Sequence, residues 1–153
     1  MRNAMAQRLC FYAIVLLAVG CSPSGQVKTY PVKGQITFDG KPMQGGGAIS
    51  LIPMTDQPGK TAAGIVKPDG SYVLGTYREA DGSMAGQFRV VVFQETVKEA
   101  APSADGTAPS SAATSTVAPA DRIPLIYSSD RQSPLTATIE PQPNEINFDL
   151  KRQ

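Results

Sequence analysis

Apolar and polar residues alternate along seven short stretches of this chain, which is the pattern of β-strands that turn one face toward a core. In residues 32–38, for example, Val32, Ile36 and Phe38 fall on one side and Lys33 falls on the other. Helical periodicity of useful length is absent after residue 20. The pattern predicts an all-β fold with strands at residues 32–38, 48–52, 61–67, 71–74, 87–94, 135–139 and 146–150.

Turn-forming residues separate these stretches. Residues 39–42 read Asp-Gly-Lys-Pro, residues 68–70 read Pro-Asp-Gly, and residues 141–144 read Pro-Gln-Pro-Asn. Proline presets one backbone dihedral and glycine accepts a positive φ, so these pieces predict tight reversals of the chain. Residues 87–94 differ from the other stretches because they are apolar on both faces, which is typical of a strand at the centre of a sheet.

The beginning of the chain has a different character. Arg2 and Arg8 accompany an uncharged, mostly apolar stretch at residues 9–19, and Gly20 and Cys21 follow it. The stretch is too short to cross a hydrocarbon core, which takes about 20 residues. This arrangement resembles a bacterial lipoprotein signal, which implies cleavage between Gly20 and Cys21 and lipidation of Cys21. An ordinary secretory signal, with Cys21 incidental, is the alternative.

The chain is therefore predicted to consist of a signal peptide at residues 1–20, a lipidated tether at residues 21–29 and a β-domain at residues 30–152. The membrane is then a partner through the lipid on Cys21, and two or three acyl chains there would make detachment negligible. Ser22 stands where an aspartate would favour retention at the inner membrane. By that resemblance we expect a cell-envelope protein at the outer membrane, facing the periplasm, or at the cell surface.

Residues 99–121 interrupt the strand pattern. They contain no aromatic residue, and Val117 is their only branched aliphatic residue. Such a segment cannot bury enough apolar surface to offset the entropy lost on ordering. We therefore expect a disordered surface insertion within one domain. A linker between two domains is the alternative, but the roughly thirty residues that follow are few for a second core.

The amino-acid composition argues against several classes of partner, active site and metal site. Removal of Arg2 and Arg8 from the 14 Lys+Arg leaves 12, against 13 Asp+Glu, and no basic cluster suggests a nucleic-acid partner. The chain has no histidine, which excludes Ser-His-Asp and Cys-His nucleophile systems and histidine metal sites. Cys10 leaves with the signal and Cys21 is used by the lipid, so no disulfide and no cysteine metal site is expected.

Two alternative functions would depend on carboxylate side chains. A carboxylate-based hydrolase would need Glu79 and Asp81 to face each other, and oxygen-ligand calcium binding would need a dense Asp/Asn loop. The aspartates at positions 39, 69, 81 and 105 each precede a glycine, which is typical of turns. We therefore expect no catalytic residue, no metal and no cofactor, and a protein that is not an enzyme.

Several pieces of the sequence, taken in order, resemble carboxypeptidase-regulatory-like domains of small bacterial envelope lipoproteins. The pieces are residues 32–36, 39–43, 64–74 and 86–92, with 123–127 and 133–136 resembling the same lipoproteins. The resemblance implies a seven-stranded antiparallel β-sandwich of the transthyretin-like (prealbumin-like) type. It also implies a structural or accessory module without catalytic residues.

The expected function is a structural or adaptor role, in which the anchored module contacts another envelope protein at the membrane surface. The alternative is a module that binds a glycan or another small ligand, such as an envelope polysaccharide. Carbohydrate sites on β-folds use aromatic platforms, and the chain has no tryptophan. Tyr77, beside Arg78, is the tyrosine expected to be exposed, so these two residues are the candidate ligand contacts.

Overall fold

The computed structural model describes residues 26–54, 57, 59–98, 114, 115 and 117–152. The predicted signal peptide at residues 1–20, the lipidation site Cys21 and the greater part of the predicted insertion lie outside the described residues. Within the described part, no helix is long and apolar enough to cross a membrane.

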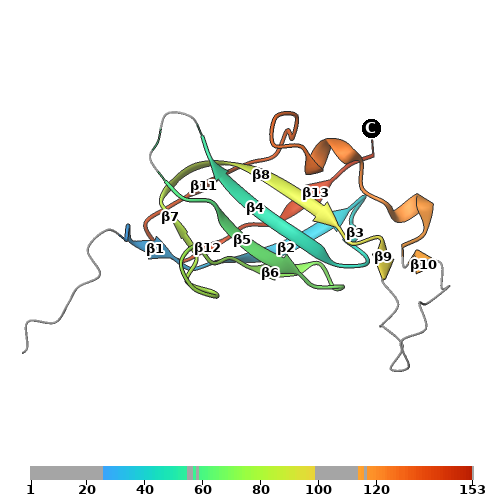
Figure 1. The fold of residues 1–153 in the computed structure, drawn as a ribbon, viewed down its shortest axis with the longest axis horizontal. Helices are drawn as coiled ribbons and strands as arrows, with labels where there is room; N and C mark the ends of the chain where they lie inside the picture. Colours follow the sequence, from blue (N-terminus) through green and yellow to red (C-terminus); the bar gives the residue numbers. More distant parts are fainter. Residues whose placement is uncertain (1–25, 55–56, 58, 99–113, 116, 153) are drawn as a thin grey trace, which may run out of the picture.

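The described chain forms a curled, mainly antiparallel β-sheet, so the predicted all-β class is confirmed (Figure 1). The sheet has the order β11-β8-β4-β5-β6-β2-β12, with β3 and β13 also paired to β2. Its strands are β2 (Val32–Phe38), β3 (Lys41–Pro42), β4 (Gly47–Pro53), β5 (Ala62–Val66), β6 (Ser71–Val73), β8 (Gly86–Gln94), β11 (Thr136–Ile139), β12 (Asn144–Glu145) and β13 (Phe148–Leu150). Each of the seven predicted stretches therefore contains a strand.

The C-terminal strands depart from a purely antiparallel arrangement. Asn144 pairs with Val32 and Phe148 pairs with Ile36, so β12 and β13 both run parallel to β2. The turn at residues 140–143 brings the chain to the start of β2, because the amide of Asn144 donates to the Pro31 carbonyl oxygen at 2.8 Å. β12 and β13 therefore run alongside β2 in the same direction.

Short elements complete the fold at its two ends. β1 (Thr29–Tyr30) pairs with β7 (Ser83–Met84) where the described chain begins. β9 (Val97–Lys98), just before the predicted insertion, pairs with β10 (Thr114–Ser115), which lies within it, at the opposite end of the fold (Figure 1). Beyond β10, Val117 is buried and two 3-10 turns follow, η2 (Pro119–Asp121) and η3 (Leu125–Ser128). The described part of residues 99–121 thus carries secondary structure.

The core lies on the inner face of the curled sheet. β8 crosses it between β11 and β4, and Phe88, Val90 and Val92 are completely buried there. Val91, on the other face of the same strand, is also buried. On that face, however, Gln87 and Phe93 are exposed and Arg89 is half-buried, so the prediction of a strand covered on both sides holds only at Val91.

Close backbone approach fastens the C-terminal segment to the core. The hydroxyl of Tyr72 donates to the Ile146 carbonyl oxygen at 2.6 Å, directly over Gly34. A Cβ atom on residue 34 would lie 1.7 Å from that same oxygen, so only glycine fits. Tyr127 is buried, and its hydroxyl exchanges two hydrogen bonds with the Lys151 backbone at 3.1 and 3.0 Å.

Candidate functional site

One row of side chains crosses the outer face of the sheet. Ala48 pairs with Phe93 on β8 and with Ile65 on β5. The pairs Val66–Tyr72 and Ala63–Gly75 flank Ile65 and Val73, which makes these two residues cross-strand neighbours. We call the four residues Phe93, Ala48, Ile65 and Val73 the outer row.

The outer row is apolar where a sheet exposed to solvent is expected to be polar. Ile65 is 76% exposed, Phe93 is 53% exposed and Val73 is 48% exposed. At its Val73 end the row meets charged side chains. Val73 pairs with Lys33 on β2, and the Lys33 ammonium lies 3.5 Å from the Glu145 carboxylate. The outer row is thus an exposed apolar strip with a polar end.

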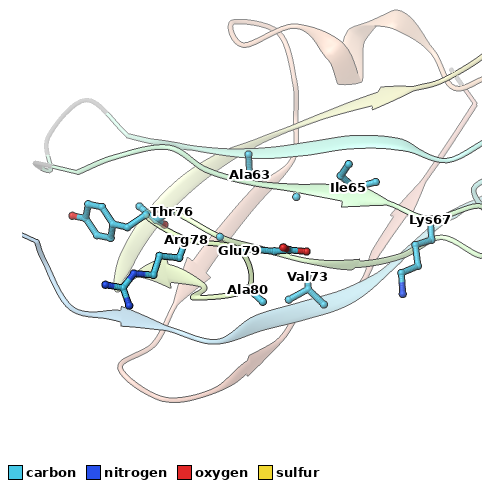
Figure 2. Close-up of a pocket in the computed structure, with 11 residues that line it drawn as sticks. Ala63, Ile65, Lys67, Val73, Thr76, Arg78, Glu79 and Ala80 are labelled. Carbon is cyan, nitrogen blue, oxygen red and sulfur yellow. The ribbon is translucent and has the colours of Figure 1, made fainter.

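Two hollows border the outer row and share Ile65. The larger has a volume of about 720 Å³, and Figure 2 shows Arg78 at one end of it and Lys67 at the other, with Ile65, Val73 and Glu79 between them. The smaller, of about 490 Å³, extends from Ile65 to Phe93 over a glycine-rich turn. Small residues form much of the floor, so the large apolar side chains stand above it. These floor residues are Gly45, Gly46, Gly47, Ala48, Ala63, Gly64 and Gly75.

The loop at residues 75–82, which forms one wall of the larger hollow, is fixed by Asp81. Its carboxylate accepts hydrogen bonds from the backbone amides of Thr76, Tyr77 and Arg78 at 2.6, 3.1 and 3.1 Å. The Thr76 hydroxyl donates to the Gly82 carbonyl oxygen at 2.7 Å. Both oxygens of Asp81 are therefore used by the loop itself, and the Glu79–Asp81 hydrolase alternative gains no support from this geometry.

Tyr77 and Arg78 lie side by side on that loop, but their surroundings differ. Tyr77 is half-buried, its hydroxyl accepts a hydrogen bond from the Val27 amide at 3.1 Å, and the Lys60 ammonium lies 5.0 Å from the centre of its ring. Arg78 is exposed. The structure thus places both candidate ligand residues at the rim of the larger hollow, with Tyr77 already holding the described start of the chain.

The described ionisable groups whose pKa is shifted belong to the sheet and its turns. A hydrogen bond from Ser71 lowers the pKa of Asp69 in the turn before β6. Hydrogen bonds from Lys151 and Thr37 lower the pKa of Asp149 beside β2, and the pKa of Lys151 is raised in return. Burial raises the pKa of Tyr72. Among the described residues, no three His, Cys, Asp or Glu side chains gather in a way that could hold a metal ion.

The outer row was not predicted from the sequence. The sequence does indicate it at three places where two apolar residues follow one another and the apolar–polar alternation is broken. These are the pairs Ile65–Val66, Tyr72–Val73 and Val92–Phe93. In each pair one residue faces the core and its neighbour must face outward. Gly20 and Cys21, the predicted processing and lipidation site, lie outside the described residues.

Comparison of the chain with protein-family models, with curated proteins and with solved structures finds no match.

Proposed function

We propose that this protein is a lipid-anchored, non-catalytic module of the bacterial cell envelope that binds a protein partner through the outer row. The observation that carries the proposal is the line of exposed apolar side chains formed by Phe93, Ile65 and Val73. Contiguous apolar surface with a polar rim is typical of protein interaction sites. The flanking hollows offer space for side chains of the partner.

The anchor is supported by the start of the sequence. Arg2, Arg8, the apolar residues 9–19 and the Gly20–Cys21 pair have the order of a lipoprotein signal. The first described strand begins at Thr29, so a lipid on Cys21 would hold the domain by a short tether. Confinement near the membrane raises the effective concentration of the module toward partners there. We place it at the outer membrane, facing the periplasm, or at the cell surface.

The finer fold proposal is a seven-stranded, transthyretin-like sandwich of the carboxypeptidase-regulatory kind. It is supported by the order of the four sequence pieces at residues 32–36, 39–43, 64–74 and 86–92, which contribute to β2, β3, β5, β6 and β8. The non-catalytic role is supported by the lack of histidine throughout the chain. The use of Asp69, Asp81 and Asp149 as hydrogen-bond acceptors for nearby turn and strand residues supports it further.

The partner role is tested by gentle crosslinking in cells, followed by purification from membranes. We expect a discrete protein partner with the wild type and at least a tenfold lower yield with the Ile65→Thr/Phe93→Thr variant. Leu125→Thr is the matched control, because Leu125 is also exposed and apolar but lies on η3, outside the outer row. Equal yields from all three proteins would remove the proposal.

The anchor is tested separately by labelling cells with radioactive palmitate. We expect label in the wild type and none in Cys21→Ser, with the variant leaving the membrane fraction. An unlabelled wild type whose fractionation matches that of Cys21→Ser would show that there is no lipid anchor.

A glycan- or small-ligand-binding module is the second candidate, and the larger hollow favours it. Tyr77, Arg78 and Glu79 line this hollow and offer an aromatic ring with charged hydrogen-bonding groups. Retention on immobilised envelope polysaccharide distinguishes it from the adaptor role. This candidate predicts loss of retention in Tyr77→Ala, with Tyr77→Phe as the control that keeps the ring, and unchanged retention in Tyr77→Ala would dismiss it.

A further inference from the structure

Basic and aromatic side chains surround the point where the described chain begins. Lys28 and Arg78 line one hollow together with Val27, Tyr77 and Asp81. Lys60 reaches the same place from the segment before β5, because its ammonium lies 5.0 Å from the centre of the Tyr77 ring. We call Lys28, Lys60 and Arg78 the basic triad, and all three residues are exposed.

The two tyrosines at this end complete an interfacial composition. The Lys28 ammonium lies 5.1 Å from the centre of the Tyr30 ring, an arrangement similar to that of Lys60 and Tyr77. Both tyrosines are half-buried, with an apolar body against the protein. Tyrosine and basic residues together are typical of surfaces at the headgroup level of a membrane.

The triad is held on a rigid support. Asp81 fixes the amides of Tyr77 and Arg78, and Ala80 adopts a left-handed φ of 60° in the same loop. A non-glycine residue in that region is strained and persists only where its surroundings determine it. The Tyr77 hydroxyl then pins Val27 against the loop. The loop that carries Arg78 is therefore joined directly to the backbone next to Lys28.

The tether is too short to let this end move far from the lipid. Val27 follows Cys21 by six residues, which span at most about 20 Å when fully extended. Lys33, near the start of β2, is paired with Glu145, and two other lysines lie farther away. Lys67 is at the opposite end of the larger hollow from Arg78 (Figure 2), and Lys41 is on β3, toward the same far end of the sheet (Figure 1).

We propose that the basic triad is a membrane-docking surface for anionic phospholipid headgroups, which orients the domain with the tether end on the bilayer and the outer row accessible from the side. The proposal rests on the lipid anchor of the proposed function. Charge complementarity supports it, because each basic residue near an anionic surface adds an attraction that salt screens.

Three acidic side chains near this end of the domain do not form ion pairs with the triad in the described structure. The Asp81 carboxylate is bound to its own loop. Glu79 lies between Arg78 and Lys67 along the larger hollow, away from the tether (Figure 2). Glu140 belongs to the turn after β11 and hydrogen-bonds to Gln142. None of the three neutralises the triad by an ion pair that the described structure contains.

The test is competitive labelling of lysine amines in protein purified from membranes and returned to vesicles. Its mass first establishes whether Cys21 carries lipid. The protein is then labelled in phosphatidylcholine vesicles with and without phosphatidylglycerol, and each lysine is quantified by mass spectrometry. We expect labelling of Lys28 and Lys60 to slow by about fivefold with phosphatidylglycerol. Lys41 and Lys67 serve as controls in the same molecule and keep their rates.

Two variants sharpen the result. Arg78→Glu should bring the labelling rates of Lys28 and Lys60 back toward equality in the two vesicles, whereas Arg131→Glu, an exposed arginine in the loop after η3, should not. Lipidated protein whose four lysines slow equally, or not at all, overturns the docking surface and leaves the anchor standing. Protein without lipid on Cys21 overturns both.

Discussion

Both faces of the same strands carry apolar residues, but those on the inner face are buried and those of the outer row are exposed. On the inner face, Val66, Tyr72 and Val92 are almost completely buried in the core. Their chain neighbours Ile65, Val73 and Phe93 project from the outer face and remain largely exposed. In these pairs only one of two consecutive residues can face the core, because successive side chains point to opposite faces.

This difference separates the residues that fold the domain from those that need another explanation. Burial contributes about 25 cal/mol per Å² of apolar surface removed from water, and the inner face receives nearly all of it. The outer row gains little on folding and leaves apolar surface in contact with water. A partner of the kind we propose would give these residues the burial that the isolated domain does not provide.

The largest expected effect is on the inner face. Replacing Phe88 with alanine empties the centre of the sheet, where its side chain is completely buried, and should cost about 3–5 kcal/mol of unfolding free energy. Urea denaturation followed by circular dichroism measures this cost. Phe93→Ala is the matched control and should cost less than about 1 kcal/mol. Equal losses from Phe88→Ala and Phe93→Ala would erase the distinction between the faces.

A backbone contact on the inner face gives the next largest effect. Gly34→Ala would force a methyl group against the Ile146 carbonyl oxygen and should cost about 2–3 kcal/mol. Gly40→Ala is the control, because it has open space around it and bears only the strain of a φ of 80°, about 1 kcal/mol. A Gly34→Ala protein as stable as Gly40→Ala would mean that the C-terminal segment does not cross β2 this closely.

Tyr127→Phe tests how the end of the chain is fastened. The substitution removes both hydrogen bonds to the Lys151 backbone but keeps the ring in the core, so we expect a loss of about 1–2 kcal/mol. Amide hydrogen exchange at Lys151 should also become faster. Unchanged exchange at that amide would show that the hydroxyl is dispensable.

A smaller effect is expected on lowering the pH. The pKa of Asp149 is depressed by hydrogen bonds from Lys151 and Thr37, so its contribution to stability is present above the ordinary aspartate value. That contribution is lost as the pH falls below about 4 and through the depressed pKa. Asp149→Asn should therefore flatten the acid limb of a stability–pH curve, and an unaltered acid limb would contradict this assignment.

The smallest effect on folding is expected from the outer row itself. Ile65→Thr/Phe93→Thr keeps β-branched or strand-compatible residues at both positions and removes no buried contact. The unfolding free energy should change by no more than about 0.5 kcal/mol for each substitution. Thermal unfolding of the purified variant checks this. A loss as large as that of Phe88→Ala would make the outer row part of the core.

The strands could be predicted from the sequence because their alternation is local. Residues 32–38 contain six residues that alternate clearly between apolar and polar sides, and the observed β2 covers the same range. Pairing partners could not be predicted in this way, since nothing within residues 146–150 indicates that they run parallel to β2. Short strands such as β1 and β7 were also missed, because two residues carry no period.

The candidate site was predictable in part. Tyr77 and Arg78 were identified from their residue types, and both lie at the rim of the larger hollow. The contact between Tyr77 and Val27 joins positions 50 residues apart, so no local pattern indicates it. The outer row likewise arises only when β8, β4, β5 and β6 come into register.

Site-specific photo-crosslinking in living cells tests most directly whether the outer row binds a partner. A photoreactive side chain at position 65 should give one discrete protein adduct on irradiation, and the adduct should disappear when Phe93→Thr and Val73→Thr are added. The same side chain at position 125, which is even more exposed but lies outside the row, should give none. No adduct at position 65, or the same adducts at both positions, would contradict the account.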